Sequence, residues 1–153
     1  MSYSIKKDGT SWRAVGGPSD IDAEEVYSET QPELGLTQIK ATIWNAIKAE
    51  RDRRKAGGVK VGANWFHSDD GSRIQQIGLV MMGASIPAGL QWKTMDGSFI
   101  TMTQALATFV FGAVAASDQA VFAVAETHWV AMEASADPAA YDYSTGWPEV
   151  YGE

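Results

Sequence analysis

The sequence predicts an α+β protein, with a small N-terminal β-hairpin and an acidic linker, then a compact domain of about four helices with two β-hairpins. Two observations predict this class. Apolar residues recur at three- and four-residue spacing in several long segments, which is typical of amphipathic helices. Short alternating runs around glycine-containing turns lie between these segments, which is the pattern of hairpins. With 153 residues, 45% of them hydrophobic, the chain is long enough to bury one sizeable core.

Residues 1–36 are expected to form the hairpin and the linker. Tyr3 and Ile5 alternate with polar residues, and Asp8-Gly9 supplies a turn before a return strand that begins near Trp12. The segment that follows is rich in glycine, proline and acidic residues, which is linker composition. Because an isolated hairpin is only marginally stable in water, we expect it to rest on the main domain or on a partner.

The main domain is expected over residues 37–136. Thr37 is predicted to cap a helix that runs to about Ala56 and stops at Gly57-Gly58. A short hairpin from Val59 to Ser68 follows. The inward face of this first helix is expected to carry Ile39, Ile43, Ala46 and Ile47.

The second helix is predicted to start at a Ser72 cap and to end before Pro87, and a second hairpin covers Gln91 to Met102. The inward face of this second helix is expected to consist of Ile74, Ile77, Gly78, Met81 and Ala84.

Thr103 is predicted to cap a third helix, which Ser117-Asp118 separates from a fourth. The inward residues of these two helices are expected to be Leu106, Phe109, Val110 and Ala113, then Val121, Val124, Ala125, His128 and Met132. Residues 137–153 form a tail that is aromatic and acidic.

The charge distribution argues against a nucleic-acid partner. Residues 38–60 carry a net charge of +5, whereas the flanking segments carry −4 and −8, so the basic cluster sits in an acidic chain that repels phosphates. The chain has no cysteine, and residues 1–7 do not have the pattern of a secretory leader, so secretion is not expected. The longest apolar stretches, Leu79 to Met82 and Phe109 to Ala116, are too short to cross a membrane. We therefore expect a cytoplasmic protein with no membrane partner.

No residue pattern indicates an enzyme, so no catalytic residue, metal ligand or cofactor is predicted. His67 lies next to Asp69-Asp70, but partner ligands at helical spacing are missing, and a solvated turn explains the run better. His128 falls on an apolar helix face and is expected to be a partly buried histidine with one hydrogen bond. The nucleophile elbow, the phosphate loop and the dinucleotide-binding fingerprint are absent.

Aromatic residues indicate a protein that works by binding another protein. Trp44, Trp65, Trp92 and Trp129 are expected to be core residues. The basic residues at the end of the first helix are explained mainly by the helix dipole, and a partner surface is the alternative. The candidate partner-binding residues are Tyr3, Ile5, Trp12, Arg51, Arg53, Arg54, Tyr141, Tyr143, Trp147 and Tyr151.

A series of short motifs follows in order between Gln38 and Met132. They are Glu50-Arg51-Asp52-Arg53-Arg54-Lys55-Ala56-Gly57-Gly58, Val61-Gly62, Trp65-Phe66-His67-Ser68-Asp69, Ser72-Arg73-Ile74, Ile77-Gly78, Trp92-Lys93-Thr94-Met95-Asp96-Gly97 and Ile100-Thr101-Met102-Thr103. This stretch resembles a domain of unknown function found in phage and prophage proteins that are often labelled tail-fibre assembly proteins. The front segments, Trp12-Arg13-Ala14-Val15 and residues 24–32, resemble the opening of the same proteins. The run Glu126-Thr127-His128-Trp129 departs from the family pattern, and partner choice can differ there.

The resemblance implies a chaperone-like assembly factor that binds the phage tail-fibre protein and assists its folding or trimerisation in the host cytoplasm. The alternative is a structural adaptor or tip protein that stays in the virion tail. The sequence leaves the oligomeric state open.

Overall fold

The computed structural model describes residues 1–7, 11–32 and 35–153. Its elements are, in chain order, β1 (Ser2–Lys6), β2 (Trp12–Val15), η1 (Pro18–Asp20), β3 (Glu25–Ser28), α1 (Leu36–Lys55), β4 (Val59–Val61), β5 (Asn64–Phe66), α2 (Asp70–Met82), η2 (Gly83–Ser85), β6 (Gln91–Lys93), β7 (Phe99–Thr101), α3 (Gln104–Glu133) and η3 (Pro138–Ala140). The chain divides into two compact units, residues 1–46 with 131–141 and residues 47–130 with 142–153. The predicted α+β class is confirmed, with an N-terminal sheet, helices and small sheets.

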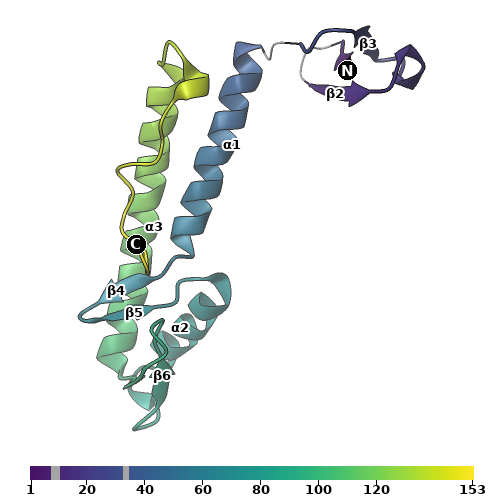
Figure 1. Cartoon of the computed structure of the whole chain (residues 1–153). Coiled ribbons are helices and arrows are strands. Elements are labelled where there is room, and N and C mark those ends of the chain that lie inside the picture. Colours follow the sequence, from purple (N-terminus) through teal and green to yellow (C-terminus); the bar gives the residue numbers. More distant parts are fainter. Residues whose placement is uncertain (8–10, 33–34) are drawn as a thin grey trace. The chain divides into compact units, whose positions relative to one another are not determined.

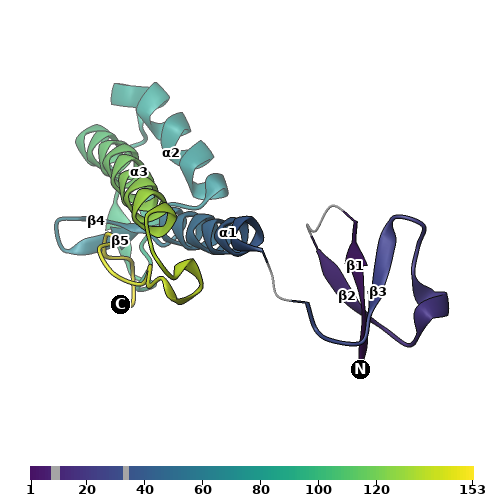
Figure 2. The same ribbon diagram turned by 90° about the horizontal axis from the view of Figure 1, so that it is seen from above.

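The N-terminal sheet has three strands where the sequence predicts two. Figure 2 shows β1 between β2 and β3, and both pairings are antiparallel. The third strand, β3, lies in the stretch that composition assigns to a linker. Its residues pair with β1 from Tyr3↔Ser28 to Lys6↔Glu25, so ladder hydrogen bonds order a segment that has little apolar content. The predicted Asp8-Gly9 turn lies outside the described residues.

The first helix, α1, agrees with its predicted bounds and differs at its cap. The backbone N–H groups of Gln38 and Ile39 donate to the carbonyl of Gly35, and Thr37 lies inside the helix instead of capping it. At the other end, Gly58 has a φ of 95°. Only glycine adopts this left-handed conformation readily, so the predicted glycine stop is confirmed.

The two predicted hairpins are present as β4–β5 and β6–β7. The backbone N–H of Met95 donates to the carbonyl of Trp65 at 2.9 Å, which ties the loop of the second hairpin to the first. In Figures 1 and 2 the β4–β5 hairpin lies beside α3. The buried cluster of this unit comes from these hairpins, α2 and α3, and consists of Val59, Phe66, Leu79, Met102, Ala107, Val110 and Val114.

The predicted tryptophan core is only partly correct. Trp44, Trp65 and Trp92 are half-buried, whereas Trp129 is 40% exposed. A large aromatic residue is expected to be buried, but Trp129 lies on a side of α3 that faces the surface.

The second helix, α2, begins earlier than predicted and faces the other way. Its N-cap is Asp69, whose carboxylate accepts the Ser72 backbone N–H at 3.0 Å, so Ser72 lies in the first turn. The buried residues are Gln76 and Leu79, and the side-chain amide of Gln76 donates to the carbonyl of His67 at 2.7 Å. The predicted inward stripe is wrong, because Ile74, Ile77 and Met81 are among the exposed large hydrophobic residues.

The predicted third and fourth helices are one continuous helix, α3, of 30 residues. Serine and aspartate in a helix interior cost only a few tenths of a kcal/mol each, and here Arg73 binds the Asp118 carboxylate. The Thr103 cap is confirmed, since its hydroxyl accepts the N–H of Leu106 at 3.2 Å. The inward residues Val110, Val121, Ala125 and Met132 are also confirmed, but Phe109 is exposed.

The continuity of α3 changes a second expectation. Within the described residues, α3 is long and apolar enough to cross a membrane by length and composition, whereas the sequence analysis found no stretch of that length. Only 22% of its most apolar stretch is buried in this structure. Length and composition alone do not distinguish a membrane span from a helix that packs against protein.

Candidate functional site

The C-terminal end of α1 carries a network of ion pairs. Arg54 pairs with Glu50 (Nε–Oε1, 2.5 Å) and with Glu153 (Nη1–Oε2, 3.0 Å), and it donates to the carbonyl of Pro148 at 2.8 Å. Arg53 pairs with the same two carboxylates, each at 2.7 Å. Spacings of three and four residues place Glu50 beside both arginines on the helix surface. The network therefore joins α1 to the end of the chain.

Burial makes this network energetically significant. Arg54 is only 8% exposed, and a guanidinium removed from water requires charged or polar partners. The hydrogen bond from Arg53, followed by that from Arg54, lowers the pKa of Glu50 to about 2. The same carboxylate and that of Glu153 raise the pKa of Arg53. These hydrogen bonds keep the Glu50 carboxylate ionised at neutral pH.

The aromatic tail packs along the same unit. The Trp147 ring lies 5.3 Å from the His128 ring and 5.7 Å from the Arg54 guanidinium carbon, and its indole N–H donates to the carbonyl of Tyr143 at 2.7 Å. His128 Nε2 lies 2.9 Å from the Thr145 carbonyl oxygen. The prediction of a buried histidine with a hydrogen bond is thus confirmed.

The last residues of the tail lie against the glycine stop of α1. Val150 is buried, and a Cβ added at Gly57 would lie 2.6 Å from its Cγ1. The N–H of Tyr151 donates to the Gly57 carbonyl at 3.0 Å, and the Tyr151 ring meets the Trp65 ring 6.1 Å away. Gly57 is therefore needed for the close approach of the tail, whereas Gly58 ends the helix.

The structure thus brings together two groups of residues that the sequence predicts as separate partner surfaces. Arg53, Arg54, Tyr143, Trp147 and Tyr151 all belong to this network of α1 and the tail. Their proposed partner-binding role stays a prediction, because the observed contacts are intramolecular.

Two further predicted partner-binding residues, Arg51 and Tyr141, lie outside this network. The Arg51 guanidinium lies 4.6 Å from the Phe122 ring and pairs with Asp52 at 2.8 Å. Tyr141 is half-buried and belongs to the unit that contains the N-terminal sheet. For these residues too, partner binding stays a prediction.

Acidification is expected to destabilise the protein through Glu50. Its folded pKa of about 2 lies below the ordinary value of 4.5, so the ionised carboxylate contributes stability that is fully present above pH 4.5. This contribution is lost as the pH falls toward about 2. Glu50→Gln should lower the free energy of unfolding at neutral pH by about 2 kcal/mol and flatten its fall in acid. Urea denaturation at a series of pH values measures both effects.

The matched control for this prediction is Glu149→Gln, which removes an exposed carboxylate from the tail without touching the arginines. It should leave the free energy of unfolding nearly unchanged at neutral pH, as for most surface substitutions. An acid profile of Glu50→Gln identical to that of the wild type would show that the network contributes nothing to the pH dependence.

The remaining predicted residues share one face of the N-terminal sheet. Ile5 is paired with Trp12 on one side and with Val26 on the other, and residues paired in this way point to the same face. The Tyr3 and Trp12 rings meet edge-on with centroids 5.3 Å apart. Val26 extends this face and is half-exposed, a contribution that the sequence analysis missed because it read Val26 as part of a linker. These four residues form the apolar sheet face.

The opposite face of the sheet is held by an ion pair. Arg13 donates to Glu25 through Nε at 3.1 Å and Nη2 at 2.8 Å. This hydrogen bonding from Arg13 is the main reason that the pKa of Glu25 is lowered to about 2. A bidentate pair across three strands fixes the width of the sheet.

Within the described residues, the outer edge of β2 presents backbone groups that pair with no other strand. The N–H of Lys6 donates to the Ser11 carbonyl at 3.0 Å, so the alternation of an antiparallel ladder makes Ser4↔Arg13 a hydrogen-bonded pair. The N–H and C=O groups of Trp12 and Ala14 consequently point away from β1. The sheet therefore offers an edge strand that a further strand can extend.

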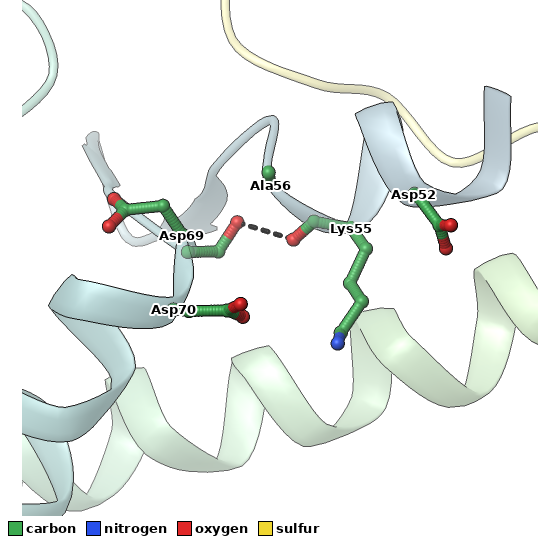
Figure 3. Close-up of a pocket in the computed structure, with 6 residues that line it drawn as sticks. Asp52, Lys55, Ala56, Asp69 and Asp70 are labelled. Carbon is green, nitrogen blue, oxygen red and sulfur yellow. Dashed lines mark hydrogen bonds between the residues drawn. The ribbon is translucent and has the colours of Figure 1, made fainter. Parts of the chain in front are cut away.

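A hollow lies between the end of α1 and the start of α2 (Figure 3). It has a volume of about 470 Å³, and its charged lining residues are Asp52, Lys55, Asp69 and Asp70. Hydrogen bonds from Ser72 lower the pKa of Asp69, which caps α2. Over the described parts of the chain, no group of three or more His, Cys, Asp or Glu residues is placed to hold a metal ion. We assign no ligand to this hollow.

The sequence analysis missed the partly buried ion pair between Arg73 and Asp118. Arg73 donates to both Asp118 oxygens, at 2.5 and 2.8 Å, and to the carbonyls of Ser68 and Lys55. Asp118 was read as a helix breaker. No sequence signal connects two residues that are 45 positions apart.

The fold defines a small α+β protein with a three-stranded sheet in one unit and helices with two short hairpins in the other. The family described as "Domain of unknown function (DUF4376)" matches residues 38–145, and the chain belongs to this family. The predicted family domain is thereby confirmed as a domain of unknown function, and its description names no activity or partner. Comparison with curated proteins and with solved structures finds no match.

Proposed function

We propose that the protein is a non-enzymatic assembly factor that binds a phage tail-fibre protein and assists its folding or trimerisation. The observation that carries the proposal is the open β2 edge next to the apolar sheet face. The resemblance of Trp12-Arg13-Ala14-Val15 to the opening of tail-fibre assembly proteins falls on this same strand. A strand-like partner is the kind of target that such an edge binds.

The chemistry of strand addition suits a folding fibre. Long-range β pairing forms slowly and leaves strand edges and apolar side chains exposed in the meantime. A partner strand that pairs with β2 satisfies the outward N–H and C=O groups of Trp12 and Ala14. Side chains of that strand then lie beside Trp12 and Tyr3, which supply rigid aromatic contact area.

Blocking the β2 edge is expected to abolish the assistance. Ala14→Pro removes an N–H that points away from β1, and Ala14 is exposed, so the sheet keeps its own ladder bonds. Loss of backbone hydrogen bonds to the partner strand should weaken binding about tenfold. The measurement is the yield of soluble fibre trimer when the fibre protein of the same phage is co-expressed with wild type, with Ala14→Pro or alone.

The control for this experiment is Ala14→Thr, which keeps the N–H and a β-forming side chain and should preserve the trimer yield. Equal trimer yields with and without the wild-type protein would refute the proposal. Mass spectrometry of purified particles provides a second readout. A stoichiometric amount of the protein in the virion would favour a structural adaptor or tip protein over an assembly factor that leaves.

A further inference from the structure

A second hollow lies between the first turns of α2 and the β6–β7 hairpin, and it is distinct from the hollow of Figure 3. Its volume is about 320 Å³, at the lower end of the range of about 300–1,000 Å³ for small-molecule sites. We call it the hairpin hollow. Besides Trp92, the side chains that line it are those of His67, Ser72, Gln75, Gln91, Lys93 and Phe99.

Two regular spacings bring these side chains together. Ser72 and Gln75 are three residues apart on α2, so they share one side of the helix. On the hairpin, Lys93 pairs directly with Phe99 of the neighbouring strand. Gln91 precedes Lys93 by two residues, so these three side chains share one face of the two-stranded ribbon. The hollow thus lies between a polar side of α2 and a mixed face of the hairpin.

The polar side chains of the hairpin hollow are available to a ligand. Among the described residues, the side chains of His67, Gln75 and Lys93 have no hydrogen-bond or ion-pair partner. The Gln91 amide group donates to the Gly89 carbonyl at 3.0 Å and to the Thr101 hydroxyl at 3.1 Å. These two bonds fix the amide group and leave its oxygen as an acceptor.

Aromatic surface lies beside these polar groups. Trp92 is partly buried against the core cluster, whereas Phe99 is 62% exposed. An exposed phenyl ring offers a rigid apolar surface on which a flat ligand can pack. The hairpin hollow therefore combines an aromatic platform with several free donors and acceptors.

The charge of the hairpin hollow differs from that of the whole chain. The protein has a net charge of −7, yet the described lining residues include Lys93 and no carboxylate. The nearby carboxylate of Asp69 already accepts the backbone N–H and the hydroxyl group of Ser72. An unpaired lysine beside neutral amides favours a ligand with a single negative charge.

We propose that the hairpin hollow binds a sugar ring that carries a carboxylate, such as a uronic acid unit of a polysaccharide. The apolar C–H face of the ring packs on Phe99. The amides of Gln75 and Gln91 bond its hydroxyl groups, since an amide both donates and accepts. Lys93, directly across the ladder from Phe99, meets the carboxylate at the edge of the stacked ring.

This assignment distinguishes the ligand from two related classes. A neutral sugar leaves the Lys93 ammonium without a counter-charge. A nucleotide also has a flat ring, but its phosphate carries more charge than one lysine balances, and the acidic chain repels phosphates. The site lies in the unit that does not contain the β2 edge, so the inference is independent of the proposed assembly role.

Isothermal titration calorimetry of the full chain tests this proposal. The probes are trigalacturonic acid, a hyaluronan tetrasaccharide and 3′-sialyllactose, with neutral maltotriose and AMP for comparison. At least one acidic saccharide should bind at least about tenfold more tightly than maltotriose and AMP, because a hydrogen bond to a charged group adds that much. Phe99→Ala and Lys93→Gln should each weaken its binding about tenfold.

The matched controls are Phe109→Ala, at a residue of similar exposure on α3, and Lys60→Gln, at an exposed lysine of β4. Neither residue lines the hairpin hollow, so both variants should bind like the wild type. Circular dichroism should show unchanged structure in all four variants, because each position is exposed.

Three outcomes would overturn the proposal. The first is that none of the three acidic saccharides binds. The second is that maltotriose or AMP binds as tightly as the best of them, which would assign the hollow to a neutral sugar or a nucleotide. The third is that Phe99→Ala and Lys93→Gln bind like the wild type, which would place the ligand elsewhere on the protein.

Discussion

Arg73→Ala is expected to lower the free energy of unfolding by about 3 kcal/mol. The Arg73 guanidinium binds the Asp118 carboxylate of α3 and the carbonyl groups of Ser68 and Lys55. Alanine leaves a partly buried carboxylate and two carbonyl oxygens without their donor. Urea denaturation followed by circular dichroism measures the change.

Two further variants separate the charge of Arg73 from its geometry. Arg73→Lys keeps the charge but cannot reach three acceptors in a planar fork, so it should recover less than half of the loss. Asp118→Asn keeps the shape of the partner and removes its charge, and it should cost less than Arg73→Ala. A lysine variant as stable as the wild type would show that the fork geometry is unimportant.

Trp147→Ala is expected to lower the free energy of unfolding by about 2–3 kcal/mol, somewhat less than truncation of a fully buried aromatic residue, since Trp147 is half-buried. The indole packs near the His128 ring and the Arg54 guanidinium, and its N–H binds the Tyr143 carbonyl. Its loss should release the tail and expose the ion-pair network to water. Increased hydrogen exchange of the backbone amides of residues 145–153 is the specific signature.

The matched control is Tyr151→Ala, which removes another aromatic ring from the same tail at a more exposed position. It should cost about 1 kcal/mol or less. If both variants lose the same stability, the contacts of Trp147 do not hold the tail.

Local signals in the sequence determined the elements that depend on neighbouring residues. The end of α1 follows from Gly58, whose positive φ only glycine adopts readily. Both short hairpins and the Thr103 cap also follow from spacing within a few residues. In each case the chemical cause and its structural effect lie close together in the chain.

The candidate site was predictable in its residues but not in its arrangement. Composition singled out the arginines at the end of α1 and the aromatic tail as unusual. The pairing of Arg53 with Glu153, 100 positions away, depends on how the tail returns to the helix. From the sequence alone, a basic residue at a helix C-terminus is explained by the helix dipole or by a partner surface. Its distant counter-ion becomes known only from the tertiary structure.

Tertiary structure alone decided which apolar face of each helix is buried. Apolar spacing gives α2 two candidate faces; the buried one carries Gln76, bonded to the His67 carbonyl, and Leu79, while Ile74 and Met81 are exposed. Asp118, which pairs with the distant Arg73, lies inside one continuous helix where the sequence predicts two. The sequence by itself determined that this protein has amphipathic helices, short hairpins and a glycine stop, because these depend on local propensity. Which faces meet depends on contacts between distant residues, and only the tertiary structure decided those.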